Sequence, residues 1–111
     1  MVIATIERRI ERAASGADPE TSVVAVDGEV DRDTAPLLEA VLIAAIDDHR
    51  RTCLDMCRVE VLDAAGARVL LAADRHATEL GRDFRVRGVH GMPARVLTLL
   101  GVDRIVAGIK H

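Results

Sequence analysis

The residues with the clearest chemical potential form a short turn of small side chains between an apolar run and a helical pattern. Val61 and Leu62 end the apolar run, and Asp63-Ala64-Ala65-Gly66 follows directly. This order predicts the end of a strand, a tight turn and a helix N-terminus, where unpaired N–H groups favour an anion or a phosphorylated hydroxyl. Neither alanine carries a hydroxyl. The turn therefore has the form of a phosphorylation site but lacks the hydroxyl that would be phosphorylated.

Side chains that commonly act in catalysis do not form a recognisable set in this sequence. His76 and His90 would each need a nucleophile or an acid within reach to act as a general base. The serines, Ser15 and Ser22, lie in or beside the loop before the second expected strand, away from the alanine turn. There is no Gly-x-Ser-x-Gly, no phosphate-binding glycine loop and no paired set of metal ligands. We expect no enzymatic activity, no metal and no cofactor.

The two cysteines, Cys53 and Cys57, are expected in or beside a strand. Residues four apart on a strand are separated by about 13 Å, which excludes a disulfide between them. We expect both thiols to be reduced and buried as small apolar groups. Redox sensing through a partner chain is the alternative interpretation.

Composition limits the possible functions. The chain has 111 residues, half of them apolar, with Phe84 as its single aromatic residue. A site that stacks nucleic-acid bases on aromatic rings is therefore not expected. The net charge of −3, with acids and arginines interleaved, indicates solvated faces rather than a nucleic-acid patch. The absence of a signal peptide or of an apolar run long enough to cross a membrane predicts a cytoplasmic location without membrane insertion.

The apolar patterns predict strands that alternate with helices in a single domain over residues 1–111. Strands are expected at 2–10, 22–26, 52–56 and 84–89, and helices near 36–46, 64–80 and 94–100, with a last short element at 105–107. The loop at 13–20 carries no helix, so the first two strands should be antiparallel. The fold class is α/β, with a mixed, mostly parallel sheet of about four or five strands and helices packed on it. Such a sheet would bring Asp31, Asp63 and His90 to one edge.

Four stretches, in this order, resemble the motifs of the STAS domain, the fold of bacterial anti-sigma factor antagonists. The similarity spans roughly Ile3 to Val106. The stretches are Gly28-Glu29-Val30-Asp31 followed by Thr34-Ala35-Pro36-Leu37; Leu54-Asp55-Met56 with Val59; Leu62-Asp63-Ala64-Ala65-Gly66; and Arg95-Val96-Leu97 with Leu99 and Gly101-Val102-Asp103-Arg104.

The resemblance implies a regulatory mechanism. An antagonist of this family binds an anti-sigma factor, usually a small protein kinase, and so frees a sigma factor. The kinase ends this binding by phosphorylating a hydroxyl in the turn, because the added negative charge disrupts the surface that contacts the partner. Here Ala64 and Ala65 occupy both hydroxyl positions. The resemblance therefore implies an antagonist in stress-related transcription control that cannot be phosphorylated at its turn.

We predict that the partner contacts Asp31, Asp63, Gly66 and Arg68, with capping of the second helix as the alternative role of Asp63. The alternative function is a structural subunit of a stress-signalling complex or of a lipid-transport ATPase. A sensor that holds a small molecule is a third interpretation, for which the sparse aromatics argue against an aromatic-lined pocket but not against a lipid-like ligand. Pairing of the strand at 2–10, or of the apolar faces of the last helix and tail, would give a homodimer.

Overall fold

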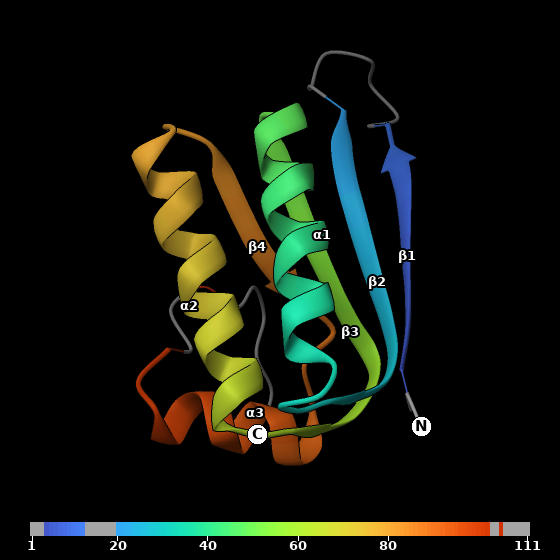
Figure 1. The fold of residues 1–111 in the computed structure, drawn as a ribbon, viewed down its shortest axis with the longest axis vertical. Helices are drawn as coiled ribbons and strands as arrows, with labels where there is room; N and C mark the ends of the chain where they lie inside the picture. The colour runs from blue at the N-terminus through green and yellow to red at the C-terminus, as the bar shows by residue number, and fades with distance from the viewer. Residues whose placement is uncertain (1–3, 13–19, 103–104, 106–111) are drawn as a thin grey trace.

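Four strands form one sheet in the order β1-β2-β3-β4 (Figure 1). β1 (Ala4–Glu11) is antiparallel to β2 (Thr21–Val30), whereas β2, β3 (Arg51–Leu62) and β4 (Asp83–Arg87) are parallel. The predicted antiparallel first pair and the mostly parallel sheet are confirmed.

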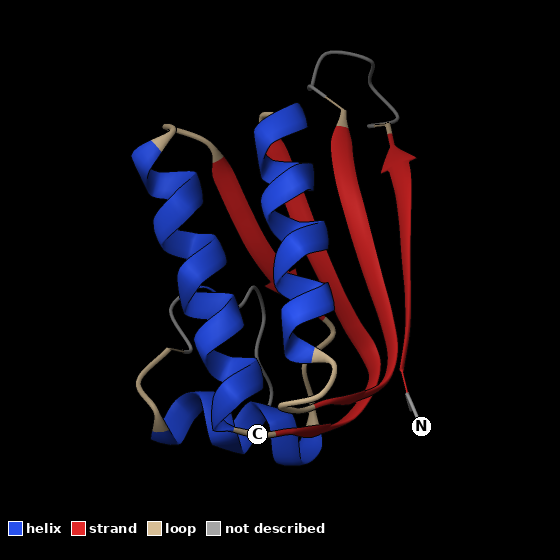
Figure 2. Ribbon diagram, viewed as in Figure 1, coloured by secondary structure: helices blue, strands red, loops and turns tan. Residues whose placement is uncertain are grey.

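The computed structural model describes residues 4–12, 20–102 and 105. The predicted loop at 13–20 and the predicted last element at 105–107 lie almost entirely outside the described residues. Helices α1 (Ala35–Asp48) and α2 (Ala64–Glu79) lie side by side on one face of the sheet. Helix α3 (Gly91–Leu99) crosses the end of the sheet at which α1 and α2 begin (Figure 2). Among the described residues, no helix covers the other face of the sheet.

The hydrophobic core lies between the sheet and the α1–α2 layer. Alternate residues of a strand face opposite sides of a sheet, so one set from each strand is buried beneath the helices. The strands contribute Val24, Val26, Leu54, Met56, Phe84 and Val86, and the helices contribute Leu38, Leu42, Ala45, Ile46, Ala67, Leu70, Ala73 and Ala77. The core is thus aliphatic with one aromatic ring, as the composition requires.

Two central strands are longer than the sequence pattern predicts. The strand expected at 22–26 continues to Val30, and the strand expected at 52–56 continues to Leu62. The pairing of β2 with β3 shifts register twice in this stretch, at the polar Asp27 and beside Gly28, whose φ is 120°. Residues that look like a turn are therefore a bulged continuation of the strand. The loops that follow these two strands therefore start later than predicted.

Two apolar residues in the predicted ranges of the first two helices are exposed in the structure. Leu37 is 56% exposed and Leu80 is 46% exposed, whereas Val69 and Ala73 of α2 are buried. Each helix touches both the sheet and its neighbouring helix, so its buried face is centred between these two contacts. Leu37 and Leu80 lie outside that face.

Candidate functional site

The candidate site forms where the two central parallel strands end and the two long helices begin. Val30 and Leu62 are register partners at the ends of β2 and β3. The backbone N–H of Asp63 donates to the carbonyl of Val30 at 3.2 Å, which holds the two strand ends together. The loop before α1 and the turn before α2 consequently lie next to each other.

Asp63 connects these two segments through its carboxylate. Its Oδ1 accepts a hydrogen bond from the N–H of Gly66 at 2.9 Å, so Asp63 caps α2. Its Oδ2 accepts from the N–H of Arg32, in the other loop, at 3.2 Å. The predicted capping role of Asp63 is confirmed, and the second hydrogen bond adds a tether that sequence reasoning missed.

Asp31 and Thr34 shape the loop that precedes α1. Oδ1 of Asp31 accepts from the N–H groups of Asp33 and Thr34 at 2.9 and 3.1 Å. The Thr34 hydroxyl accepts from the N–H of Asp31 at 3.0 Å and donates to the carbonyl of Glu29 at 2.9 Å. These local bonds replace the ordinary side-chain cap, which Thr34 does not make. The loop is therefore held by its own side chains.

Gly66 is buried, and its lack of a side chain permits the close packing of the turn. A Cβ at this position would lie 2.6 Å from Cδ1 of Leu62 and 2.7 Å from both Cγ1 and the carbonyl oxygen of Val30. A glycine is required because the first turn of α2 rests on the ends of β2 and β3. The predicted contact of Gly66 with a partner stays a prediction.

The two alanines lie at the surface of this edge. Ala64 is exposed, and Ala65 is half-buried with its methyl group against the core. Both line a shallow depression together with Asp31, Arg32, Asp33, Asp63 and Arg68, which we call the docking edge. The structure therefore brings together the predicted residues Asp31, Asp63, Ala64, Ala65 and Arg68. Two methyl groups lie among three carboxylates and two guanidinium groups.

His90 does not line the docking edge, contrary to the expectation that it would join Asp31 and Asp63. It precedes α3, and its Nε2 lies 2.9 Å from the carbonyl oxygen of Cys57 on β3. The later ends of the strands, described above, account for the difference. His90 meets β3 five residues before the strand ends at Leu62.

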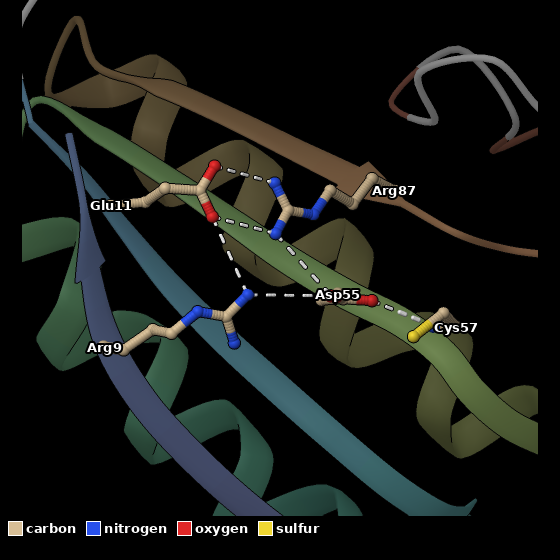
Figure 3. A network of polar contacts seen from close by, with 5 residues as sticks. All are labelled: Arg9, Glu11, Asp55, Cys57 and Arg87. Atoms are coloured by element: carbon tan, nitrogen blue, oxygen red, sulfur yellow. Dashed lines mark hydrogen bonds and ion pairs between the residues drawn. The ribbon is translucent and has the colours of Figure 1, made fainter. Parts of the chain in front are cut away.

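The open face of the sheet carries a charge network that sequence reasoning missed (Figure 3). Arg87 donates through its two terminal nitrogens to the Glu11 carboxylate at 3.2 and 3.1 Å, and it lies 3.6 Å from Oδ2 of Asp55. Arg9 lies 3.7 Å from Glu11 and 4.0 Å from Asp55. Val23 is fully buried although no described helix covers this face, and it is the register partner of Arg9. The long side chains of the network thus cover apolar surface.

The network shifts the pKa values of its acids. The hydrogen bonds and charge of Arg87 lower the pKa of Glu11. Desolvation raises the pKa of Asp55, but hydrogen bonds from Cys57 and the charges of Arg87 and Arg9 outweigh it, so the net shift is downward. Both carboxylates are held in their ionised form.

The cysteines differ from the prediction that both are buried. Cys53 is buried, whereas Cys57 is exposed. The pairing of β4 with β3 stops at Asp55, so no described strand flanks Cys57 on that side. Burial raises the pKa of Cys53, and the hydrogen bond to Asp55 raises the pKa of Cys57. Neither environment produces the reactive thiolate that a redox sensor uses.

Within the part of the chain that the structure describes, no helix combines the length and apolar character needed to cross a membrane. In the same part, no group of three or more His, Cys, Asp or Glu side chains is placed to hold a metal ion.

The fold and the docking edge define a small two-layer α/β domain that presents the N-termini of two helices at one end of a mixed sheet. A family model described as "Mlab, STAS domain" matches residues 13–107. The chain therefore belongs to the STAS family. A search of curated protein sequences gives no match.

Solved structures agree with this assignment. An anti-sigma factor antagonist from Mycobacterium paratuberculosis is 27% identical with a TM-score of 0.75, over 95% of this chain and 87% of that one. A serine-to-glutamate variant of RsbS from Moorella thermoacetica is 26% identical with a TM-score of 0.68, over 90% and 85% of the two chains. The anti-sigma factor antagonist SpoIIAA in its unphosphorylated form is 16% identical with a TM-score of 0.71, over 95% and 90%, and shares the fold.

Proposed function

We propose that this protein is an anti-sigma factor antagonist without a phosphorylation switch at its turn. It binds an anti-sigma factor of the protein-kinase type through the docking edge and thereby releases a sigma factor, in the cytoplasm and in stress-related control of transcription. One observation carries the proposal. The exposed Ala64 and the half-buried Ala65 occupy the first turn of α2, where the family resemblance puts the phosphorylated hydroxyl.

The charge and shape of the docking edge support a protein partner. Asp33 and Arg68 are exposed and line the depression, and neither side chain has a described hydrogen bond or ion pair within the chain. They are free to pair with charges on a partner, while Asp31 and Asp63 hold the loops in place. A depression lined by two alanines and by charges of both signs favours a partner with a small apolar contact flanked by complementary charges.

The binding test uses charge reversal at residues that do not hold the fold. Asp33→Lys and Arg68→Glu should each weaken capture of the anti-sigma factor at least tenfold in an affinity pull-down followed by calorimetric titration. Arg75→Glu is the matched control, because Arg75 is exposed on the same helix and does not line the docking edge. Equal capture by all four proteins would contradict the proposed surface.

The regulatory test uses the captured kinase with ATP. The wild-type chain should gain no phosphate on residues 60–70, while Ala64→Ser or Ala65→Ser supplies a hydroxyl for transfer. Mass spectrometry of the tryptic peptides measures the outcome. Stoichiometric phosphate on residues 60–70 of the wild-type chain would refute the proposal.

The second candidate is a permanent structural subunit of a stress-signalling complex or of a lipid-transport ATPase. The same alanines favour it, since a subunit that never dissociates needs no hydroxyl at its contact surface. The pull-down separates the two functions: recovery of an ATPase or permease subunit instead of a kinase-fold protein would support this candidate.

A further inference from the structure

The strand β1 lies at the edge of the sheet and pairs with another described strand on one side only. Its side chains alternate between the two faces. Thr5, Glu7, Arg9 and Glu11 face the open side, while Ile6, Arg8 and Ile10 face the helix side. Ile10 is 45% exposed although it faces the helix side. An edge strand whose outer backbone groups pair with no described strand, and which carries a half-exposed isoleucine, is a surface on which a further strand can pair.

We propose that β1 pairs antiparallel with β1 of a second copy of this chain, so that two domains form one continuous eight-stranded sheet. The proposal is independent of the proposed function. It fits a two-fold axis, since an antiparallel strand pair brings the same surface of both copies together. The argument for this partner is the charge pattern of the strand itself.

Two-fold pairing permits few registers, because alternate residues face opposite sides of the sheet. An odd-numbered residue can lie opposite only another odd-numbered residue, and an even-numbered residue opposite only an even-numbered one. The two-fold axis must therefore pass between two copies of the same residue and not between neighbouring positions. With the axis at Arg8, Glu7 lies opposite Arg9 of the second copy, and the same pair recurs across the axis. Ile6 lies opposite Ile10, again twice. Residues 5–11 are then paired, which is all but one of the eight residues of β1.

The neighbouring registers either lack this complementarity or pair few residues. With the axis at Ile10, Arg9 lies opposite Glu11 twice, but Arg8 lies opposite Arg12 and only residues 9–11 of β1 are paired with β1 of the second copy. With the axis at Glu7, the two Glu7 side chains lie opposite each other. With the axis at Arg9, the two Arg9 side chains oppose each other and Glu7 opposes Glu11. With the axis at Ile6, Glu7 meets Thr5 and no opposite charges are paired. Directly opposed like charges destabilise strand pairing, and opposite charges stabilise it.

The register centred on Arg8 places the two Arg8 residues opposite one another. Nη2 of each Arg8 lies 3.6 Å from Oδ2 of Asp48 at the end of α1 in its own chain. Each guanidinium therefore has a local counter-charge on the helix side. The repulsion at the axis is reduced, while both Glu7–Arg9 pairs lie on the open face.

The dimer leaves both docking edges accessible. The axis runs perpendicular to the sheet, so the helices of both copies lie on one face and the two docking edges point to opposite ends of the assembly. β1 borders the sheet on the side away from α2, as Figure 1 shows. Each copy can then hold its own partner.

A charge-exchange experiment tests the pairing. Sedimentation equilibrium of the wild-type chain should show a concentration-dependent dimer. Glu7→Arg alone and Arg9→Glu alone should each raise the dissociation constant at least tenfold, because both cross-strand pairs become repulsive. An equimolar mixture of the two variants should dimerise again, since every Arg at position 7 or 9 then lies opposite a Glu, and the double variant should also recover. Arg85→Glu, an exposed charge on β4, is the matched control and should leave the dimer unchanged.

A cross-linking experiment tests the register. In a Cys57→Ser background, Arg8→Cys should form a disulfide-linked dimer under mild oxidation, since directly opposed Cα atoms lie about 4.5–5.5 Å apart. Glu7→Cys should not, because the two positions would lie more than about 7 Å apart. A monomer at all concentrations, a dimer insensitive to both reversals, or failure of the mixture to recover would overturn the proposal. Cross-linking of Glu7→Cys in place of Arg8→Cys would overturn the register.

Discussion

Replacement of Asp63 by alanine should destabilise the domain by about 2 kcal/mol. The substitution removes the α2 cap, the 2.9 Å bond from the N–H of Gly66, and such caps contribute about 0.5–2 kcal/mol. It also removes the 3.2 Å bond from the N–H of Arg32, an exposed contact worth about 0.5–1 kcal/mol. A loss of 2 kcal/mol in a domain of this size lowers the Tm by roughly 8 °C.

Urea unfolding followed by circular dichroism measures this change, with Asp33→Ala as the matched control. Asp33 lies in the same depression, but its carboxylate accepts no described hydrogen bond, so its loss should change stability by less than about 0.5 kcal/mol. Asp63→Asn should fall between the two, because its amide oxygen can still cap α2. If Asp63→Ala proved as stable as Asp33→Ala, the role assigned to the tether and the cap would be refuted.

Three further outcomes follow from the packing and charges. Gly66→Ala should lower the unfolding free energy by about 1–3 kcal/mol in urea titration, because its Cβ would lie 2.6–2.7 Å from the ends of β2 and β3; stability equal to wild type would contradict this packing. Ala64→Glu should leave the unfolding free energy unchanged or raise it by up to about 1 kcal/mol, since a carboxylate is favourable at a helix N-terminus. The same variant should bind the partner at least tenfold more weakly, with Ala64→Gln as the neutral control. Undiminished capture by the glutamate variant would count against the proposed surface. The pKa values of Glu11 and Asp55 are lowered in the folded chain. The stability that these two carboxylates contribute is therefore present at pH values above their unfolded pKa, about 4, and is lost as the pH falls through their folded pKa. Arg87→Met should reduce the loss of unfolding free energy between pH 7 and pH 3, measured by urea unfolding. An unchanged pH dependence of the unfolding free energy would contradict the role of the charge network.

The order of strands and helices was predictable because apolar period and helix boundaries are local signals. Pro36 in the first turn of α1 and Gly81 just after α2, with φ of 66°, both mark helix ends where the structure has them. The continuation of β2 through Gly28 was not predictable. A polar stretch with glycine gives the same local pattern in a turn and in a bulged strand, and only the pairing with β3 distinguishes them.

The part of the candidate site that lies within one short sequence motif was predictable. Asp63 and the two alanines share one turn, so their proximity follows from sequence spacing. The bond from Arg32 to Asp63 spans 31 residues and depends on the parallel ends of β2 and β3. The contact between Glu11 and Arg87 spans 76 residues and joins β1 to β4 across the sheet, so no local pattern in the sequence could indicate it.

The carboxylate of Asp63 has a consequence for the entropy of docking. Because its two oxygens hold the N–H groups of Gly66 and Arg32 at once, the two segments are ordered before any partner arrives. A partner that binds both segments therefore causes little further loss of backbone conformational entropy, and preorganised surfaces of this kind bind with a smaller entropic cost. Hydrogen exchange at the amides of Arg32 and Gly66 should therefore accelerate together when that carboxylate is removed.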